Sequence, residues 1–169
     1  MESPDTAQIS PADIDLVVFD FDGVLTDNRV LVFDDGHEAV FCNRSDGIAF
    51  ELFRAYQVPV LILSKEKNPV VAARAAKLRV PAIQGIDDKK TALREYCAAQ
   101  QITPERVLYV GNDLNDLSVM RIVGHPFCPA DSHPAILSFS RRLQSRGGEG
   151  VAREIAETVL GLAYPEKPD

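Results

Sequence analysis

Three aspartates stand close together in the segment Asp20-Phe21-Asp22-Gly23-Val24-Leu25-Thr26-Asp27, directly after the apolar run Leu16–Phe19. One aspartate here would be an ordinary strand end entering a polar turn, but the pattern Asp-x-Asp-Gly-x-x-Thr-Asp is too specific for that explanation. Two carboxylates this close repel each other unless a cation or a shared proton relieves them. A hard divalent ion that prefers oxygen ligands, such as Mg²⁺, would relieve them. The segment therefore predicts a metal-dependent chemical centre.

Further polar residues follow other apolar runs of the chain. Ser64 ends the run Val60–Leu63, and the loop Gly111-Asn112-Asp113-Leu114-Asn115-Asp116 follows Val107–Val110. Taken alone, Ser64 has a simple structural explanation as a turn residue. Lys89 lies where a helix is expected to begin, which the helix dipole disfavours, so its placement needs a reason.

The expected secondary structure brings these residues to one place. Apolar strands are predicted at 16–19, 58–63 and 107–110, and helices at 46–56, 70–78, 89–99, 116–123 and 151–160. Strands that alternate with helices imply parallel pairing and a doubly wound α/β sheet, similar to the Rossmann fold. Open sheets of this kind bind ligands at the carboxyl ends of their strands. We therefore expect the polar residues to meet at that edge.

One segment interrupts this alternation. Arg29–Phe33 and Glu38–Cys42 are rich in β-forming residues and are separated by Asp34-Asp35-Gly36, which is a good hairpin turn. A hairpin placed directly after the first strand would project from the ligand-binding edge of the sheet. The chain is too short to contain a separate cap domain in addition to this sheet and the hairpin. The hairpin also carries more apolar side chains than a free two-stranded ribbon would leave in water, so we expect it to associate.

Length and composition indicate one globular domain. The chain has 169 residues, of which 46% are hydrophobic and 25% charged. We assign 14–162 to that domain and expect flexible ends at 1–13 and 163–169. The net charge of −7, with no dense basic cluster, argues against nucleic acid as a partner. No apolar run is long enough to span a bilayer, and three scattered cysteines favour a reducing cytoplasm.

The Asp20 segment resembles the first motif of haloacid dehalogenase-type phosphatases. That resemblance implies that Asp20 attacks phosphorus to form an aspartyl-phosphate, and that Asp22 acts as the general acid and base. It also implies that Asp20 and the backbone carbonyl of Asp22 bind Mg²⁺. Ser64 corresponds to the second motif, whose hydroxyl donates to a phosphoryl oxygen. Lys89 fits the third motif, a lysine that neutralises the nucleophile and the phosphate, in preference to the neighbouring Lys90.

The loop after 107–110 resembles the fourth motif of the family but departs from it. The family usually has an aspartate ligand directly after the glycine, whereas this chain has Asn112. An asparagine carbonyl oxygen can ligate Mg²⁺ with less charge, and Asp113 is the alternative ligand. Asp116 fits the second acidic position of the metal motif, which orients either a metal-bound water or Lys89.

The inserted hairpin, the missing cap and the tail from Arg146 to Glu154 resemble one capless branch of the family. It contains 3-deoxy-D-manno-octulosonate 8-phosphate phosphatases, 2-keto-3-deoxynononate 9-phosphate phosphatases and the C-terminal domain of some acylneuraminate cytidylyltransferases. The resemblance implies a small phosphorylated sugar acid as substrate and a homotetramer formed through the hairpins. Expected substrate contacts are Arg44, Lys65 and Gly148, while Arg74 has a simpler explanation as a solvated helix residue.

Two other functions stay open at this stage. A catalytically weak oligomerisation domain, like the cytidylyltransferase domains, would explain Asn112, although a scaffold would not require the nucleophile, acid, serine and lysine together. A phosphoryl-transferring mutase or a phosphate-binding regulator is disfavoured, because no cap is available to hold a large intermediate.

Overall fold

The computed structural model describes residues 8–164, and its centre is a parallel sheet in the order β5-β4-β1-β6-β7-β8. The three central strands, β1 (Leu16–Phe19), β4 (Val60–Leu63) and β6 (Val107–Val110), are buried at every residue. They are buried because helices cover both faces of the sheet, which explains their continuous apolar sequences. The outer strands are β5 (Ala82–Ile83), β7 (His125–Cys128) and β8 (Arg141–Arg142). The doubly wound α/β sheet predicted from the sequence is confirmed.

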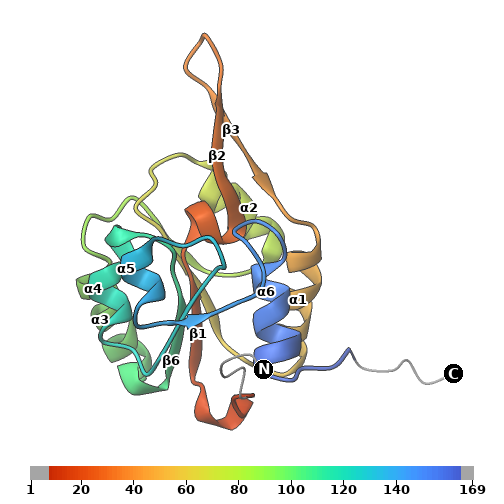
Figure 1. Cartoon of the computed structure of the whole chain (residues 1–169), viewed down its shortest axis with the longest axis vertical. Helices are drawn as coiled ribbons and strands as arrows, with labels where there is room; N and C mark the ends of the chain where they lie inside the picture. The colour runs from red at the N-terminus through yellow and green to blue at the C-terminus, as the bar shows by residue number, and fades with distance from the viewer. Residues whose placement is uncertain (1–7, 165–169) are drawn as a thin grey trace, which may run out of the picture.

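The helices form one layer on each face of the sheet (Figure 1). One layer consists of α1 (Ser45–Ala55), α2 (Val70–Leu78) and α6 (Val151–Glu154), and α6 continues into a π-helical turn at Ile155–Val159. The other layer consists of α3 (Lys89–Gln100), α4 (Leu117–Met120) and α5 (Pro134–Leu137). Successive side chains of β1 face opposite helix layers: Phe19 packs beneath α1, whereas Val18 faces α3.

The elements that sequence reasoning missed are short or irregular. β5 and β8 have two residues each, too few to show a hydrophobic period, and β7 begins with His125-Pro126. His125 is the first residue of that strand. The helix predicted at 116–123 is shorter in the structure, where it is α4. It starts after Asp116 because Leu114–Asp116 form a 3-10 turn.

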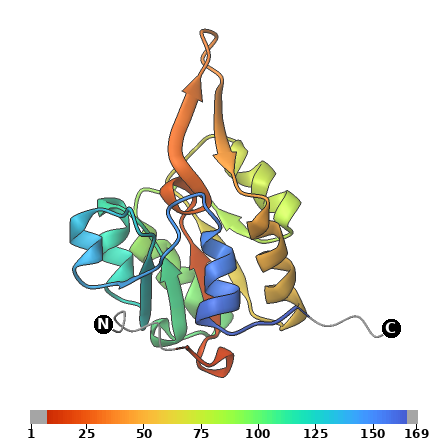
Figure 2. The same cartoon turned by 45° about the vertical axis from the view of Figure 1, so that its right-hand side comes forward.

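The predicted hairpin is present and stands away from the rest of the molecule (Figure 2). It pairs β2 (Thr26–Val32) with β3 (Glu38–Cys42), and Gly36 provides the positive φ of 86° that its turn requires. Within residues 8–164 no separate cap domain accompanies it. Five of its apolar residues are about half exposed or more: Val30 51%, Leu31 53%, Val32 60%, Phe33 49% and Phe41 66%.

The ends of the described chain pack on the domain. Ile9 is buried and its N–H donates to the carbonyl of Val159, while Pro11–Asp13 form a 3-10 turn. Residues 9–13 thus contact the domain, while the flexibility expected for 1–13 stays a prediction. At the other end, Ala163 accepts a hydrogen bond from the Tyr56 hydroxyl. The rest of the two expected tails, 1–7 and 165–169, lies outside the described residues. No helix between residues 8 and 164 has the length and apolar character to cross a bilayer.

Candidate active site

A tight turn directly after β1 directs two aspartates to one side. The N–H of Asp20 donates to the carbonyl of Val110, which fixes Asp20 at the end of the sheet. Asp22 is extended and Gly23 has φ +80°, and the turn is closed by hydrogen bonds from Thr26 N to the Phe21 carbonyl and from Gly23 N to Thr26 Oγ1 (3.1 Å). The reversal at Gly23 lets the side chains of Asp20 and Asp22 line the same cavity.

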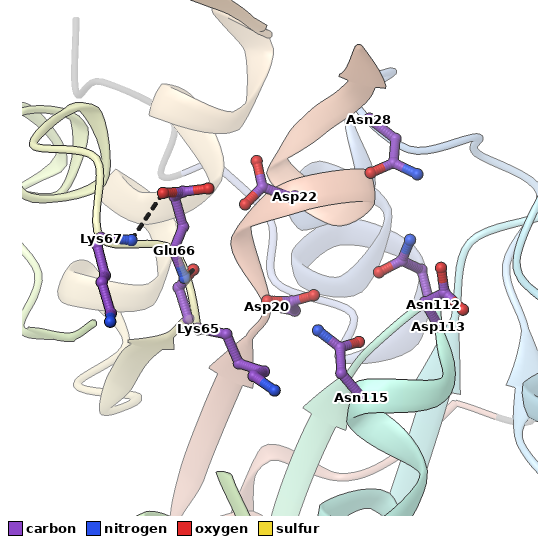
Figure 3. A pocket seen from close by; sticks show the side chains of 10 residues that line it. Asp20, Asp22, Asn28, Lys65, Glu66, Lys67, Asn112, Asp113 and Asn115 are labelled. Atoms are coloured by element: carbon purple, nitrogen blue, oxygen red, sulfur yellow. Dashed lines mark hydrogen bonds between the residues drawn. The ribbon is translucent and has the colours of Figure 1, made fainter. Parts of the chain in front are cut away.

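This cavity has a volume of about 600 Å³ and lies at the carboxyl edge of the sheet (Figure 3). It brings together most of the predicted site residues, from β1, β4 and the loop after β6. It is also lined by residues that sequence reasoning had not assigned. The lining residues are Asp20, Asp22, Asn28, Ser64, Lys65, Glu66, Lys67, Asn112, Asp113 and Asn115.

Lys89 lies below the floor of this cavity. Its Nζ is 2.7 Å from Asp20 Oδ1 and 2.7 Å from Asp116 Oδ1, and its side chain is fully buried. Burial alone would lower the pKa of Lys89, but the charges of Asp20 and Asp116 raise it above its ordinary value. The lysine therefore stays charged, and its pairing with two carboxylates explains why it occupies the first turn of α3.

One ammonium group does not neutralise the carboxylates around it. Burial, followed by the nearby charge of Asp116, raises the pKa of Asp20 to about 8, although Lys89 opposes the shift. With these groups alone, the shift favours the protonated form of Asp20, which is a poorer nucleophile than the carboxylate. A further cation at Asp20 would restore its ionised form.

The oxygen atoms next to Asp20 fit such a cation. The Asn112 amide lies between Asp20 Oδ2 and the main-chain carbonyl of Asp22. In one orientation of this amide its nitrogen donates to Asp20 Oδ2 at 3.2 Å and to the Asp22 carbonyl at 3.0 Å. In the other orientation its oxygen faces these two oxygens, so that three oxygens converge. Within residues 8–164 no three His, Cys, Asp or Glu side chains are arranged to hold a metal by themselves. The fitting donor set is thus one carboxylate, one carbonyl and one amide oxygen, which suits a hard ion.

Asp116 points away from that donor set. Its Oδ1 accepts from Lys89 Nζ (2.7 Å) and from the Tyr109 hydroxyl (2.9 Å), and its Oδ2 accepts from Asn112 N (3.0 Å). Of the two roles left open for Asp116, this geometry favours the orientation of Lys89.

Two further residues lie near Asp116. The sequence did not predict the contact of Tyr109 with Asp116, because a tyrosine within an apolar strand is normally interpreted as a core residue. Asp113 is exposed on the cavity wall, and its carboxylate accepts from Leu114 N (2.7 Å).

Asp22 and Ser64 also line the cavity. Burial, followed by the charge of Glu66, raises the pKa of Asp22, which favours a protonated acid at the start of a reaction. Ser64 is buried at the end of β4, and its Oγ accepts from Glu66 N at 3.0 Å. The hydroxyl hydrogen of Ser64 is thus available to donate to an anion in the cavity.

Two predicted substrate contacts are not brought to this cavity. Arg44 lines a second cavity of about 480 Å³ between α1 and α2, together with Arg54, Arg74 and Lys77. Within one chain, direct contact between Arg44 and a substrate on Asp20 is therefore not supported. Lys65, by contrast, does line the cavity around Asp20.

Gly148 is hydrogen-bonded to the turn that carries Asp22. Its N–H donates to the Val24 carbonyl at 3.0 Å, and its carbonyl accepts from Asn43 Nδ2 at 3.1 Å. An added Cβ at Gly148 would lie 2.5 Å from Asp27 N, so only glycine fits at this close approach. The Gly-rich tail thus joins both ends of the hairpin to the turn that carries Asp22, instead of lining the cavity.

The chain is similar to known hydrolases over most of its length. Residues 82–155 match the model of the haloacid dehalogenase-like hydrolase family. The chain is 32% identical to 3-deoxy-D-manno-octulosonate 8-phosphate phosphatase from Yersinia pestis, over 88% of this chain and 81% of that protein. A crystal structure of the Yersinia pestis enzyme superimposes with a TM-score of 0.84, covering 88% of this chain and 82% of that one.

Two other solved structures are similar over most of their length. A HAD family hydrolase from Streptomyces avermitilis is 48% identical, with a TM-score of 0.89 and coverage of 92% of this chain and 90% of that one. The Moraxella catarrhalis octulosonate 8-phosphate phosphatase, solved with a magnesium ion, a phosphate ion and KDO, is 27% identical, with a TM-score of 0.85 and coverage of 90% and 88%. The chain therefore belongs to the haloacid dehalogenase-like hydrolases, in the capless branch that includes the octulosonate 8-phosphate phosphatases.

Proposed function

We propose that this enzyme is a magnesium-dependent phosphatase that removes the phosphate from a small sugar acid, either 3-deoxy-D-manno-octulosonate 8-phosphate or a nonulosonate 9-phosphate. The observation that carries the proposal is the buried Lys89 at 2.7 Å from Asp20, with Asp22 on the same cavity. The names of the relatives support the substrate class. The cytoplasmic setting expected from the cysteines stays a prediction.

The residues have complementary roles in this reaction. An Asp20 oxygen attacks phosphorus and the bond from phosphorus to the sugar oxygen breaks, while Asp22 gives its proton to the leaving alcohol. Asp22 then takes a proton from a water molecule, which attacks the aspartyl-phosphate and releases phosphate and Asp20. Lys89 and the Ser64 hydroxyl stabilise the charge on the phosphoryl oxygens.

Magnesium would be held by the Asp20 carboxylate, the Asp22 carbonyl and the Asn112 amide oxygen, with Asp113 as the alternative ligand. When bound, it supplies positive charge next to the nucleophile and the phosphoryl group. Asn112 brings no negative charge to this set, so we expect weaker Mg²⁺ binding than an aspartate there would give.

We also propose that the hairpins assemble four chains. The exposed apolar side chains of the hairpin would be buried by association. Large exposed apolar patches of this kind mark protein–protein contacts. The cavity of Arg44, Arg54, Arg74 and Lys77 would then provide a basic surface to a neighbouring active site, where Arg suits a substrate carboxylate. This would explain why Arg44 is remote from Asp20 of its own chain.

A panel of sugar phosphates, assayed with Mg²⁺ and with EDTA, tests the proposed activity. We expect Mg²⁺-dependent phosphate release, fastest for the eight- or nine-carbon ulosonates, and a loss in kcat of at least about 10³-fold in Asp20→Asn. Asp15→Asn makes the same chemical change at the opposite end of β1 and should leave kcat unchanged. A folded, assembled protein that hydrolyses no member of the panel would favour the scaffold function, for which Asn112 is the supporting feature.

Replacement of Asn112 by aspartate tests the ligand set. The added charge should lower the Mg²⁺ concentration for half-maximal activity by about 10-fold, equivalent to about 1.4 kcal/mol. Asn115→Asp is the matched control, because it adds the same charge to the lining of the same cavity at a residue outside the proposed ligand set. Equal effects of the two substitutions would show that Asn112 is not a ligand.

Charges on the hairpin test the assembly. Val32→Asp combined with Phe41→Asp should convert the tetramer to smaller species in sedimentation velocity, because charges are costly to bury. Since both side chains are exposed in the single chain, the unfolding midpoint of the dissociated chain should change little. Phe139→Asp, at an exposed site just after α5 and outside the hairpin, should leave the assembly intact. A parent protein that sediments as a monomer would contradict the proposal.

A further inference from the structure

Tyr109 is an unusual residue for the middle of a parallel sheet. It is the largest of the fully buried side chains and lies in β6, paired with Val18 on one side and Pro126 on the other. Its body packs in the apolar layer beneath α3, yet its hydroxyl donates to Asp116 Oδ1 at 2.9 Å. Burial raises the pKa of Tyr109 well above its ordinary value, so the phenol remains a donor.

The hydroxyl shares one carboxylate oxygen with Lys89. Asp116 Oδ1 accepts from Lys89 Nζ at 2.7 Å as well as from Tyr109, while its other oxygen accepts from the N–H groups of Asn112 (3.0 Å) and Asp113 (3.3 Å). Donors on both oxygens prevent the carboxylate from rotating. A second donor on Oδ1 also draws negative charge from it, so its attraction for the ammonium is reduced.

We infer that Tyr109 is a positioning residue for phosphoryl transfer: its hydroxyl holds Asp116 so that the Lys89 ammonium stays shared between Asp116 and Asp20. This inference rests on the proposed function, because the shared lysine must act on the Asp20 nucleophile. Without the hydroxyl, Oδ1 would keep more charge and draw Lys89 toward Asp116, away from Asp20 and the phosphoryl group. Tyr109 does not line the cavity, so substrate binding should be little affected.

The simpler explanation is a core tyrosine that uses Asp116 only to satisfy its own hydroxyl. A buried hydroxyl without a partner is costly, so a hydrogen bond by itself is expected in either case. The two explanations differ in what happens at Lys89. If Tyr109 only fills the core, phenylalanine would leave the environment of the Lys89 ammonium unchanged.

Tyr109→Phe, compared with Tyr96→Phe, separates the explanations. Tyr96 lies on α3, packed against the same apolar layer, and its replacement removes a phenol without touching Asp116. For Tyr109→Phe we expect kcat to fall about 10-fold with KM within about twofold. We also expect a displaced Lys89 Nζ signal in NMR spectra of ¹⁵N-lysine-labelled protein, assigned with Lys89→Arg. Tyr96→Phe should change neither quantity.

Each outcome decides the inference. An unmoved Lys89 signal, or a kcat within twofold of the parent when the parent is active, would overturn it. If the parent hydrolyses no phosphate ester, the proposed function fails, while the Lys89 signal still shows whether Tyr109 positions the lysine. If Tyr109→Phe does not fold, 3-fluorotyrosine at position 109 keeps the side-chain shape and donates more strongly. A Lys89 signal that stays in place in that protein would also overturn the inference.

Discussion

The buried ammonium of Lys89 between two carboxylates is the interaction on which the rest of the site depends. A charge without a partner would be very costly at full burial, and two carboxylates around one ammonium leave an excess of negative charge. Burial, followed by the nearby charge of Asp116, raises the pKa of Asp20 to about 8, although Lys89 opposes the shift. The structure therefore has, beside Asp20, an oxygen donor set that could hold one more positive charge.

The fold supplies this arrangement through the edge of its parallel sheet. β1, β4 and β6 end side by side, so Asp20, Ser64 and the loop at Asn112 meet although they lie far apart in the sequence. The turn that carries Asp22 is held from behind by Gly148, which bonds to Val24 and Asn43. The sheet thus positions Asp20, and the Gly-rich tail fixes the turn that carries Asp22.

Sequence reasoning was most successful where a pattern had a local cause. Buried central strands are continuously apolar because helices cover both faces, so β1, β4 and β6 were predicted, as was the hairpin from Asp34-Asp35-Gly36. It failed where structure depends on distant partners. Two-residue β5 and β8 exist only because neighbouring strands offer hydrogen bonds. The contact of Tyr109 with Asp116, seven residues apart, depends on how the loop after β6 folds back toward the strand, which no linear pattern describes. The remote position of Arg44 likewise depends on how α1 and α2 pack.

The dependence of Asp20 on an added cation can be measured by titrating the protein with Mg²⁺ at pH 7 in a calorimeter, using buffers of different ionisation enthalpy. A carboxyl with a pKa of about 8 is mostly protonated at that pH, and a bound cation would expel its proton. The account predicts the release of about one proton for each Mg²⁺ bound, and none from Asp20→Asn. Mg²⁺ binding to the parent protein without proton release would contradict it.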